Sequence, residues 1–232
     1  MAGSTGGEVA ELENYSPAAH ERDPFENWNR KMFAFNEFLD EWLLRPTAVA
    51  YRWAVPEVAD RGVTNFFANI DDVTTIFDAT LQLKGHYVVV STTRVMFNTT
   101  MGLGGFFDVA TSFGLERLDE DFGQTLGYWG VPSGPYLMWP VFGPATVRHS
   151  VGRVVDAVAI PRWAEDDLTH YAVNYGLKIV DRRADLIPAE GFIVGDKYLV
   201  VRNAYLQRRD YLVNDGVVED PFAADEPVMD DF

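Results

Sequence analysis

Apolar side chains recur at intervals of three and four residues between positions 25 and 42: Phe25, Trp28, Met32, Phe35, Leu39 and Trp42. At 100° per residue these positions fall within an arc of roughly 100°, which predicts an amphipathic helix. We expect Asp23 to cap this helix. Arg45-Pro46 is expected to end it, because a residue before proline avoids the α region. Phe33 falls on its polar side, and Asn36 lies at the edge of the apolar stripe.

The same periodicity predicts further helices at residues 56–68, 71–83, 85–100, 146–158, 167–187 and 196–213. No convincing two-residue alternation, which is typical of strands, is present. The chain is therefore expected to be a mainly α-helical single domain over residues 23–214. Residues 1–22 are small and polar and are expected to be a flexible leader that combines a cloning remnant with a linker. Residues 215–232 are acidic and contain two prolines, which predicts a disordered tail.

One long segment, residues 122–147, carries no charged side chain. It is long enough to cross a bilayer, but its four prolines and five glycines exclude a single spanning helix. Its tyrosines and tryptophans favour a membrane interface, because each combines an apolar body with a polar tip. Two interpretations stay open. The segment is either an irregular loop at a membrane interface or along a lipid path, or a Gly/Pro-rich loop packed over an ordinary core.

The composition excludes several classes of function. The chain has 35 acidic and 19 basic residues and a net charge of −16, which argues against nucleic acid as a partner, since phosphate neutralisation needs clustered basic side chains. It contains no cysteine, so disulfides, thiolate nucleophiles and Cys-ligated metals are excluded. The histidines show no zinc-binding spacing, and neither a GxSxG motif nor a phosphate loop is present. We therefore expect no cofactor, no metal and no enzymatic activity.

Asp119-Glu120-Asp121 is a cluster of acids with two interpretations. A calcium site is one, but the cluster lacks the alternating ligands and the central glycine of a calcium-binding loop. A solvated turn before a helix at Phe122, with Asp121 as the N-cap, explains the residues better. Three arginines among apolar neighbours, Arg94, Arg148 and Arg153, also leave two options open. One is binding of a phosphate head group through their forked donors; the other is pairing with Asp108 or Asp156.

Several blocks resemble the MlaA (VacJ) family of outer-membrane lipoproteins. The most distinctive are DPFENWNRKMFAFN at 23–36, RVMFNTTMGLGGFFDVA at 94–110 and DFGQTLG at 121–127. Shorter similar blocks occur at 45–51, 63–69, 134–140, 182–186 and 198–209. Together they cover about residues 23–214 in the family's order. The family's lipoprotein signal and acylated cysteine are absent from this sequence.

The resemblance implies a non-enzymatic phospholipid transporter at the periplasmic face of the Gram-negative outer membrane. It implies a ring-like bundle of amphipathic helices in the inner leaflet, around an amphipathic central channel. Phospholipids misplaced in the outer leaflet would pass through the channel to a soluble periplasmic lipid carrier. The resemblance also implies association with a trimeric porin.

A phospholipid path needs an apolar wall for the acyl tails and polar groups for the head. The candidates for the wall come from the first helix and the uncharged segment: Phe33, Phe35, Asn36, Tyr128, Gly130, Gly134 and Tyr136. Arg148 and Arg153 are the head-group candidates. The candidates for contact with the membrane interface are all tryptophans: Trp28, Trp42, Trp129 and Trp139.

Two other classes of function stay open. A soluble, aromatic-rich module that binds a hydrophobic peptide or a glycan would be monomeric and lipid-free in buffer. An enzyme acting on lipids or cell wall would lose turnover when one carboxylate is neutralised, although no coherent catalytic set is present. A lipid transporter would instead need detergent or a porin partner and would carry bound phospholipid.

Overall fold

The computed structural model describes residues 21–159, 168–187 and 195–217. Its elements follow in the order α3 (Glu26–Leu39), a π-helical turn η1 (Asp40–Leu44), α4 (Arg45–Ala54), α5 (Glu57–Leu81), α6 (Gly85–Thr100), α7 (Val109–Ser112), α8 (Phe122–Tyr128), β1 (Tyr136–Trp139), β2 (Gly143–Thr146), α9 (Val147–Ala159), α10 (Leu168–Leu186) and α11 (Lys197–Val213). The mainly α-helical class is therefore confirmed. The bounds of α6, α9, α10 and α11 agree with the predicted ranges to within one residue. Most of the expected leader and tail lies outside the described residues.

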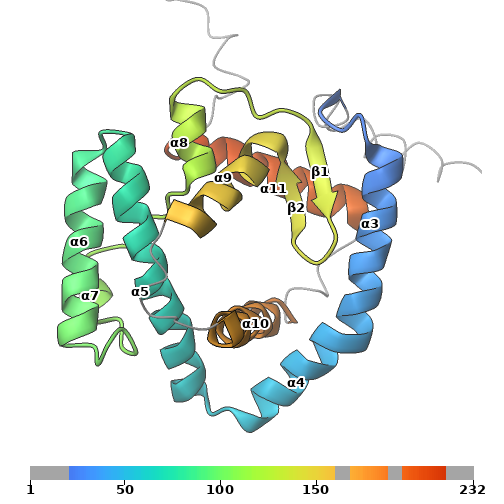
Figure 1. The fold of residues 1–232 in the computed structure, drawn as a ribbon. Helices are drawn as coiled ribbons and strands as arrows, with labels where there is room; N and C mark the ends of the chain where they lie inside the picture. Colours follow the sequence, from blue (N-terminus) through green and yellow to red (C-terminus); the bar gives the residue numbers. More distant parts are fainter. Residues whose placement is uncertain (1–20, 160–167, 188–194, 218–232) are drawn as a thin grey trace, which may run out of the picture.

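These elements are arranged as a ring (Figure 1). α3, η1 and α4 form one side, and α5, with α6 against its outer face, forms the other. The remaining gap between these sides is closed by α8, α9 and the two strands, with α11 behind them. Contacts join neighbours along this closing part, from α3 to β1, from β2 to α9, from α9 to α8 and from α8 to α5. α10 lies inside the lower part of the ring, viewed nearly along its axis in Figure 1, and packs on α4 and α5.

The uncharged segment contains a helix and a β-hairpin, so the expectation of an irregular loop without strands is wrong. β1 and β2 pair antiparallel, with Tyr136 opposite Thr146 and Trp139 opposite Gly143. Tyr136 and Met138 are buried while Trp139 is exposed, so β1 does alternate. Each strand has only four residues, which is too short for a two-residue period to stand out in the sequence.

Two asparagines of α3 complete the hydrogen bonding of β1. The Asn29 amide donates to the Tyr136 carbonyl at 3.1 Å and accepts from the Met138 amide at 2.8 Å. Two turns further along α3, Asn36 donates to the Trp139 carbonyl at 2.9 Å and accepts from the Val141 amide at 2.7 Å. An isolated two-stranded hairpin is marginal in water, so these side chains stabilise it by replacing a third strand.

Replacing Asn36 with alanine is expected to destabilise the protein by about 1 kcal/mol, because two backbone groups of the hairpin turn lose their partner where water can partly replace it. Denaturant unfolding in detergent measures the change. Asn27→Ala, at an exposed position of the same helix, is the matched control and should stay within about 0.5 kcal/mol of the unmodified protein. Equal losses in the two variants would contradict the role of Asn36.

The first helical segment does not end at Arg45-Pro46, as the proline predicts. The amide of Arg45 bonds the carbonyl of Asp40, five residues back, and α4 then continues with Pro46 in its first turn. A π-helical turn widens the helix just before Pro46. The proline then lies in the first turn of α4, where backbone N–H groups have no acceptor within the helix, so its missing N–H costs no hydrogen bond.

The helices predicted at 56–68 and 71–83 are one continuous helix, α5. Asn69, at the predicted break between the two, is buried inside α5 and donates to Thr99 Oγ1 at 3.0 Å. Its side chain therefore joins α5 to α6.

Candidate functional site

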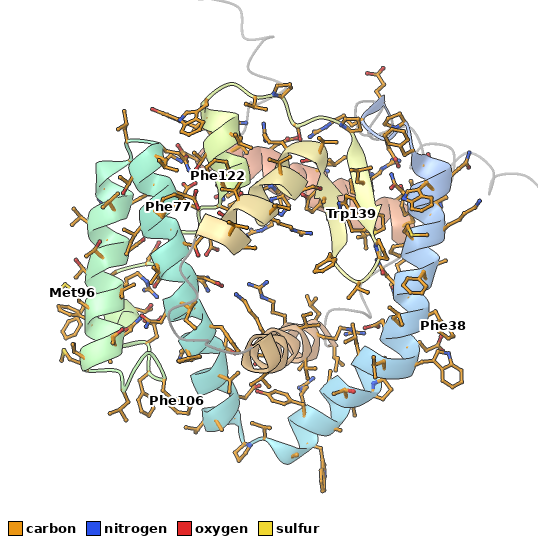
Figure 2. All side chains as sticks on the ribbon, viewed as in Figure 1. Phe38, Phe77, Met96, Phe106, Phe122 and Trp139 are labelled. Atoms are coloured by element: carbon orange, nitrogen blue, oxygen red, sulfur yellow. The ribbon has the colours of Figure 1, made fainter. Side chains whose placement is uncertain are left out.

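Large apolar side chains lie mainly on the outside of the ring. All five tryptophans whose side chains are described are exposed, from 44% at Trp139 to 89% at Trp53. Phe38 on α3 and Met96 on α6 point away from the ring on opposite sides (Figure 2). The buried apolar residues among those described are few: several alanines, Phe67 and one small cluster of Tyr136, Met138, Tyr198 and Leu206. A water-soluble protein usually keeps such large side chains inside.

α3 turns most of its predicted apolar stripe outward, although Met32 packs against the buried cluster. Phe35 is 43% exposed, and Trp28 and Trp42 are exposed as well. Phe33, from the predicted polar side, packs edge-on against Tyr198 with 5.7 Å between the ring centroids. The inward face is the one that carries the asparagines bonded to the hairpin, so the aromatic face is left for an external partner.

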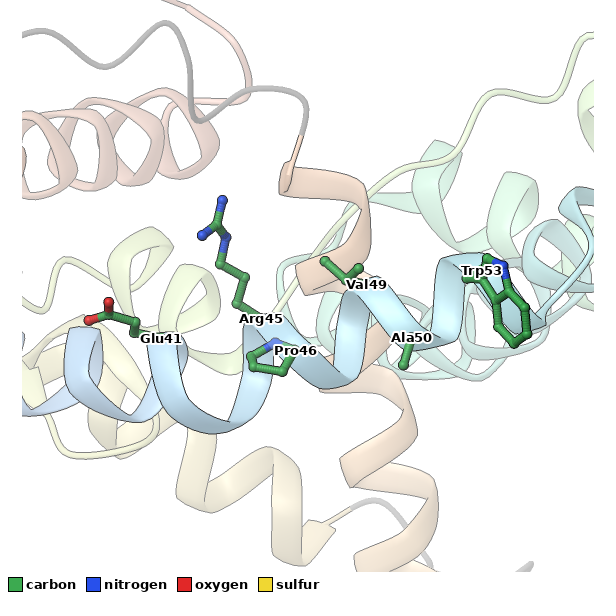
Figure 3. Close-up of a pocket in the computed structure, with 6 residues that line it drawn as sticks. All are labelled: Glu41, Arg45, Pro46, Val49, Ala50 and Trp53. Atoms are coloured by element: carbon green, nitrogen blue, oxygen red, sulfur yellow. The ribbon is translucent and has the colours of Figure 1, made fainter.

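An open groove of about 550 Å³ follows the outward face of η1 and α4 (Figure 3). Its lining is apolar except at one end: Glu41, Arg45, Pro46, Val49, Ala50 and Trp53. The opposite face of α4 meets α10, where the Tyr51 hydroxyl lies 3.4 Å from Asp181 Oδ1. The groove therefore continues the apolar exterior of α3.

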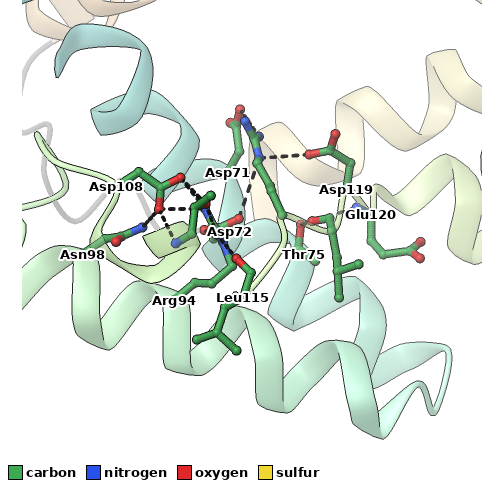
Figure 4. Close-up of polar contacts among 12 residues, drawn as sticks. Asp71, Asp72, Thr75, Arg94, Asn98, Asp108, Leu115, Asp119 and Glu120 are labelled. Atoms are coloured by element: carbon green, nitrogen blue, oxygen red, sulfur yellow. Dashed lines mark hydrogen bonds and ion pairs between the residues drawn. The ribbon is translucent and has the colours of Figure 1, made fainter. Parts of the chain in front are cut away.

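The interior between α5 and α6 is held by charged groups (Figure 4). Arg94 is 1% exposed and donates to Asp72 Oδ2 at 3.1 Å, to the Leu115 carbonyl at 2.5 Å and to Asp108 at 3.3 Å. Burial raises the pKa of Asp72, although Arg94 acts in the opposite direction. Of the two options for Arg94, pairing with Asp108 is confirmed, and the further partner Asp72 makes Arg94 a structural residue.

Asp23 is not the N-cap of α3. The residue at the cap position is Phe25, and no side chain caps the helix there. Asp23 is instead buried and accepts hydrogen bonds from Asn29 at 2.7 Å, from the Tyr198 hydroxyl and from Arg202 at 3.1 Å. It therefore ties the start of α3 to α11.

The acidic triplet before α8 is engaged by three different basic residues. Asp119 lies 3.1 Å from Arg117, Glu120 lies 2.8 Å from Lys84, and Asp121 lies 2.6 Å from Arg209. Asp121 also caps α8 as predicted, accepting from the Gln124 amide at 2.9 Å. Burial alone would raise the pKa of Asp121, but the nearby imidazole of His149 and the hydrogen bonds from Arg209 hold it well below its usual range. Within the described residues, no group of His, Asp and Glu side chains is placed to hold a metal ion.

Two carboxyl groups meet between α5, α8 and α9. Asp78 is fully buried and accepts from Thr125 Oγ1 at 3.1 Å, while its Oδ2 has no partner. Burial, and next the charge of Asp156, raises the pKa of Asp78 to about 7. Asp156 accepts from the Phe122 amide at 3.3 Å, and burial raises its pKa to about 6. Both carboxyl groups therefore hold their protons more tightly than a solvated aspartic acid does, at the place where α5, α8 and α9 pack.

The structure brings only some of the lipid-path candidates to a surface. Phe35 and Tyr128 are exposed, whereas Phe33 and Asn36 lie at the contact of α3 with the hairpin and the core. Tyr136 is 0% exposed, so it belongs to the core and meets no lipid in this conformation. Gly130 and Gly134 have φ values of +84° and +69°, which suit glycine in the turns that connect α8 to β1.

The two head-group candidates differ in their surroundings. Arg153 donates to His149 Nε2 at 2.9 Å and to the carbonyls of Phe142 and Pro144 at 3.3 and 3.2 Å, so it ties the hairpin to α9. Arg148 is 9% exposed, and its side chain donates to the Val131 carbonyl at 2.8 Å and to no other of the described residues. Pairing with Asp156, the other option for these arginines, is not observed.

The candidate interface tryptophans are all exposed, but two have their polar tips satisfied within the protein. The indole N–H of Trp139 donates to Ser150 Oγ at 2.9 Å, and that of Trp129 lies 3.4 Å from the Leu81 carbonyl. Sequence reasoning missed Trp53 and the groove, because a helix was expected to end before them. No helix within the described ranges has both the length and the hydropathy to span a membrane.

Comparisons with known proteins agree with this architecture. The sequence model of the family described as "MlaA lipoprotein" matches residues 21–212. Proteins of Shigella flexneri and Escherichia coli K12, both named intermembrane phospholipid transport system lipoprotein MlaA, are each 36% identical over 201 residues, covering 84% of this chain and 79% of theirs. The protein of that name from Haemophilus influenzae is 32% identical, over 84% of this chain and 80% of its own length.

A solved structure is similar as well. It is described as the structural basis for maintenance of bacterial outer membrane lipid asymmetry. The TM-score is 0.75 at 35% sequence identity, and the match covers 83% of this chain and 99% of the other.

Proposed function

Because the chain belongs to the MlaA lipoprotein family, we propose that it is an outer-membrane lipoprotein of an intermembrane phospholipid transport system. Its role is to maintain the lipid asymmetry of the outer membrane. The observation that carries this proposal is the distribution of side chains. Large aromatic and aliphatic groups face outward from the ring, while buried carboxylates and guanidinium groups hold its interior.

The apolar exterior supports a position in one leaflet, at the periplasmic face of the membrane. A ring that exposes tryptophans on α3, η1 and α4, and that has no spanning helix within its described part, suits a protein lying in the interface rather than crossing the bilayer. In this position the exposed aromatic side chains contact lipid, and the burial of their area favours membrane binding.

The finer mechanism that we propose is removal of phospholipids misplaced in the outer leaflet. They move through an amphipathic channel and are passed to a soluble periplasmic carrier. Phe35, on the outward face of α3, is a candidate for contact with the acyl tails of the surrounding leaflet. Tyr128, Phe33, Asn36, Gly130 and Gly134 remain the candidates along the path. Tyr136 is buried in the core behind these residues and packs there rather than contacting lipid.

We also propose a trimeric porin as a partner of the outer surface. The many large apolar side chains that the ring exposes match lipid or a membrane-embedded protein better than water. The soluble, peptide- or glycan-binding alternative requires the same side chains to stay in water.

The transport role is tested in Gram-negative cells that lack their own family member. The chain, expressed behind a lipoprotein signal with an acylated cysteine, should lower the fraction of phospholipid that an external phospholipase can reach. A protein that arrives in the outer membrane and leaves this fraction unchanged would contradict the proposal.

The substitution Phe35→Asp is expected to weaken binding to phospholipid vesicles at least tenfold, because a carboxylate replaces an aromatic ring that contacts lipid. The protein should still fold, since Phe35 is exposed and its loss leaves no cavity. Vesicle flotation measures binding, and circular dichroism in detergent measures folding. Phe35→Leu, which keeps an apolar side chain, is the control. Undiminished flotation of Phe35→Asp would show that this face of α3 lies in water.

A further inference from the structure

The junction of α8, α9 and α11 holds one more guanidinium than carboxylate around Arg148. The charges that act on Arg148 are those of Arg209, Asp210, Asp121 and Arg22. Both carboxylates are already engaged, Asp121 by Arg209 at 2.6 Å and Asp210 by Arg22 at 2.6 Å. Arg148 is therefore the positive charge in excess.

Arg148 is also nine-tenths buried. Its Nε is shielded from solvent and has no hydrogen-bond partner, and no ion pair between described residues includes this side chain. Burial, followed by the charge of Arg209, lowers the pKa of Arg148, yet an arginine stays protonated in proteins. A buried cation without a counterion is costly, so this site favours an anion.

The geometry of the guanidinium indicates the kind of anion. Nη1 is used by the Val131 carbonyl. Nε is shielded in this conformation, so Nη2, for which no hydrogen bond to a described residue is found, is the donor left for an oxyanion of a phosphate or a carboxylate. Gly127 packs on the group so closely that a Cβ there would lie 3.1 Å from Cζ of Arg148. The glycine therefore leaves room for the guanidinium.

The neighbours of this site favour a lipid as the source of the anion. Tyr128 and Trp129, at the end of α8, are about half exposed. Tyrosine and tryptophan concentrate at the level of lipid head groups. Ser133 adds a hydroxyl to which Arg22 donates at 3.4 Å, while the Ser133 carbonyl accepts from the Arg148 amide at 3.1 Å.

We propose that Arg148 binds the phosphate group of a phospholipid at this junction, with Arg22 and Ser133 as neighbouring polar groups. This inference rests on the proposed function and assigns one docking point for the head group on the ring. The chemistry recognised is a phosphate oxyanion, so inorganic phosphate is the other source to be distinguished.

The experiment compares Arg148→Met with Arg208→Met, which removes an exposed arginine from α11. Each protein, in neutral detergent, is titrated with phosphatidylglycerol, with diacylglycerol of the same acyl chains and with inorganic phosphate. The unmodified protein and Arg208→Met should bind phosphatidylglycerol at least tenfold more tightly than diacylglycerol. Arg148→Met should lose this preference.

Three results would overturn the proposal. One is an unchanged preference in Arg148→Met. Another is Arg148-dependent binding of inorganic phosphate with no preference between the two lipids, which makes the site a free-phosphate site. The third is failure of Arg148→Met to fold without ligand. On this proposal the substitution removes an uncompensated charge, so the unfolding midpoint of the variant should be at least as high as that of the unmodified protein. Binding of neither lipid by the unmodified protein would instead contradict the proposed function.

Discussion

Replacing Arg94 with methionine is expected to destabilise the protein by about 3–5 kcal/mol. The guanidinium bridges Asp72 on α5 and Asp108 before α7, and it also bonds the Leu115 carbonyl. Asp72 is fully buried, so the variant leaves a carboxylate in the interior whose remaining basic neighbour is Arg117, with Nε 3.8 Å from Oδ1. Denaturant unfolding in detergent measures the loss.

The control is Arg61→Met. It breaks an exposed ion pair between Arg61 and Glu57, both on α5, and should cost less than about 1 kcal/mol. The double variant Arg94→Met/Asp72→Leu should recover part of the stability, because it removes the stranded charge as well. Equal losses for Arg94→Met and Arg61→Met would contradict a buried ionic interior.

Replacing Asp78 with asparagine is expected to stabilise the protein by about 2–3 kcal/mol more at pH 8 than at pH 5. The folded-state pKa of Asp78 is raised from 3.8 to about 7, so the folded protein binds the proton more tightly than the unfolded chain does. The resulting stability is present at acidic pH and is lost as pH rises from about 4 through about 7. Asparagine imitates the protonated acid and removes this loss.

The comparison with the unmodified protein at each pH cancels the groups that do not interact with Asp78, and what it measures is Asp78 together with its partner Asp156. The lowered pKa of His149 acts in the opposite direction below about pH 6.5, but it is common to both proteins. Glu116→Gln, at an exposed position, should show no such dependence. Thermal unfolding at the two pH values gives the result, and an Asp78→Asn effect of the same size at both would show that this carboxyl group ionises normally.

Local patterns predicted most of the helices, because helical periodicity repeats over several turns. α6, α9, α10 and α11 were predicted well for this reason. The hairpin was missed because its strands are short, and because its stability depends on Asn29 and Asn36, which lie over 100 residues earlier in the sequence. The family was predicted from blocks of residues in a fixed order, and this prediction is confirmed.

Which face of a helix meets the protein could not be predicted from its apolar stripe. In α3 the stripe with Phe35 faces outward, whereas Asn29 and Phe33 face the core. A periodic pattern shows that two faces differ, but it does not say whether the apolar one is covered by protein or by lipid. The buried pair Asp72–Arg94 was missed for a related reason, since a charged residue on a helix is usually exposed.

The central claim is that the ring lies in a membrane with an apolar outside and carries phospholipid. Native mass spectrometry of the protein, extracted from membranes in mild detergent, tests this claim most directly. The account predicts that intact protein retains phospholipid and aggregates when the detergent is removed. A monomer that stays dispersed in plain buffer with no lipid bound would contradict it.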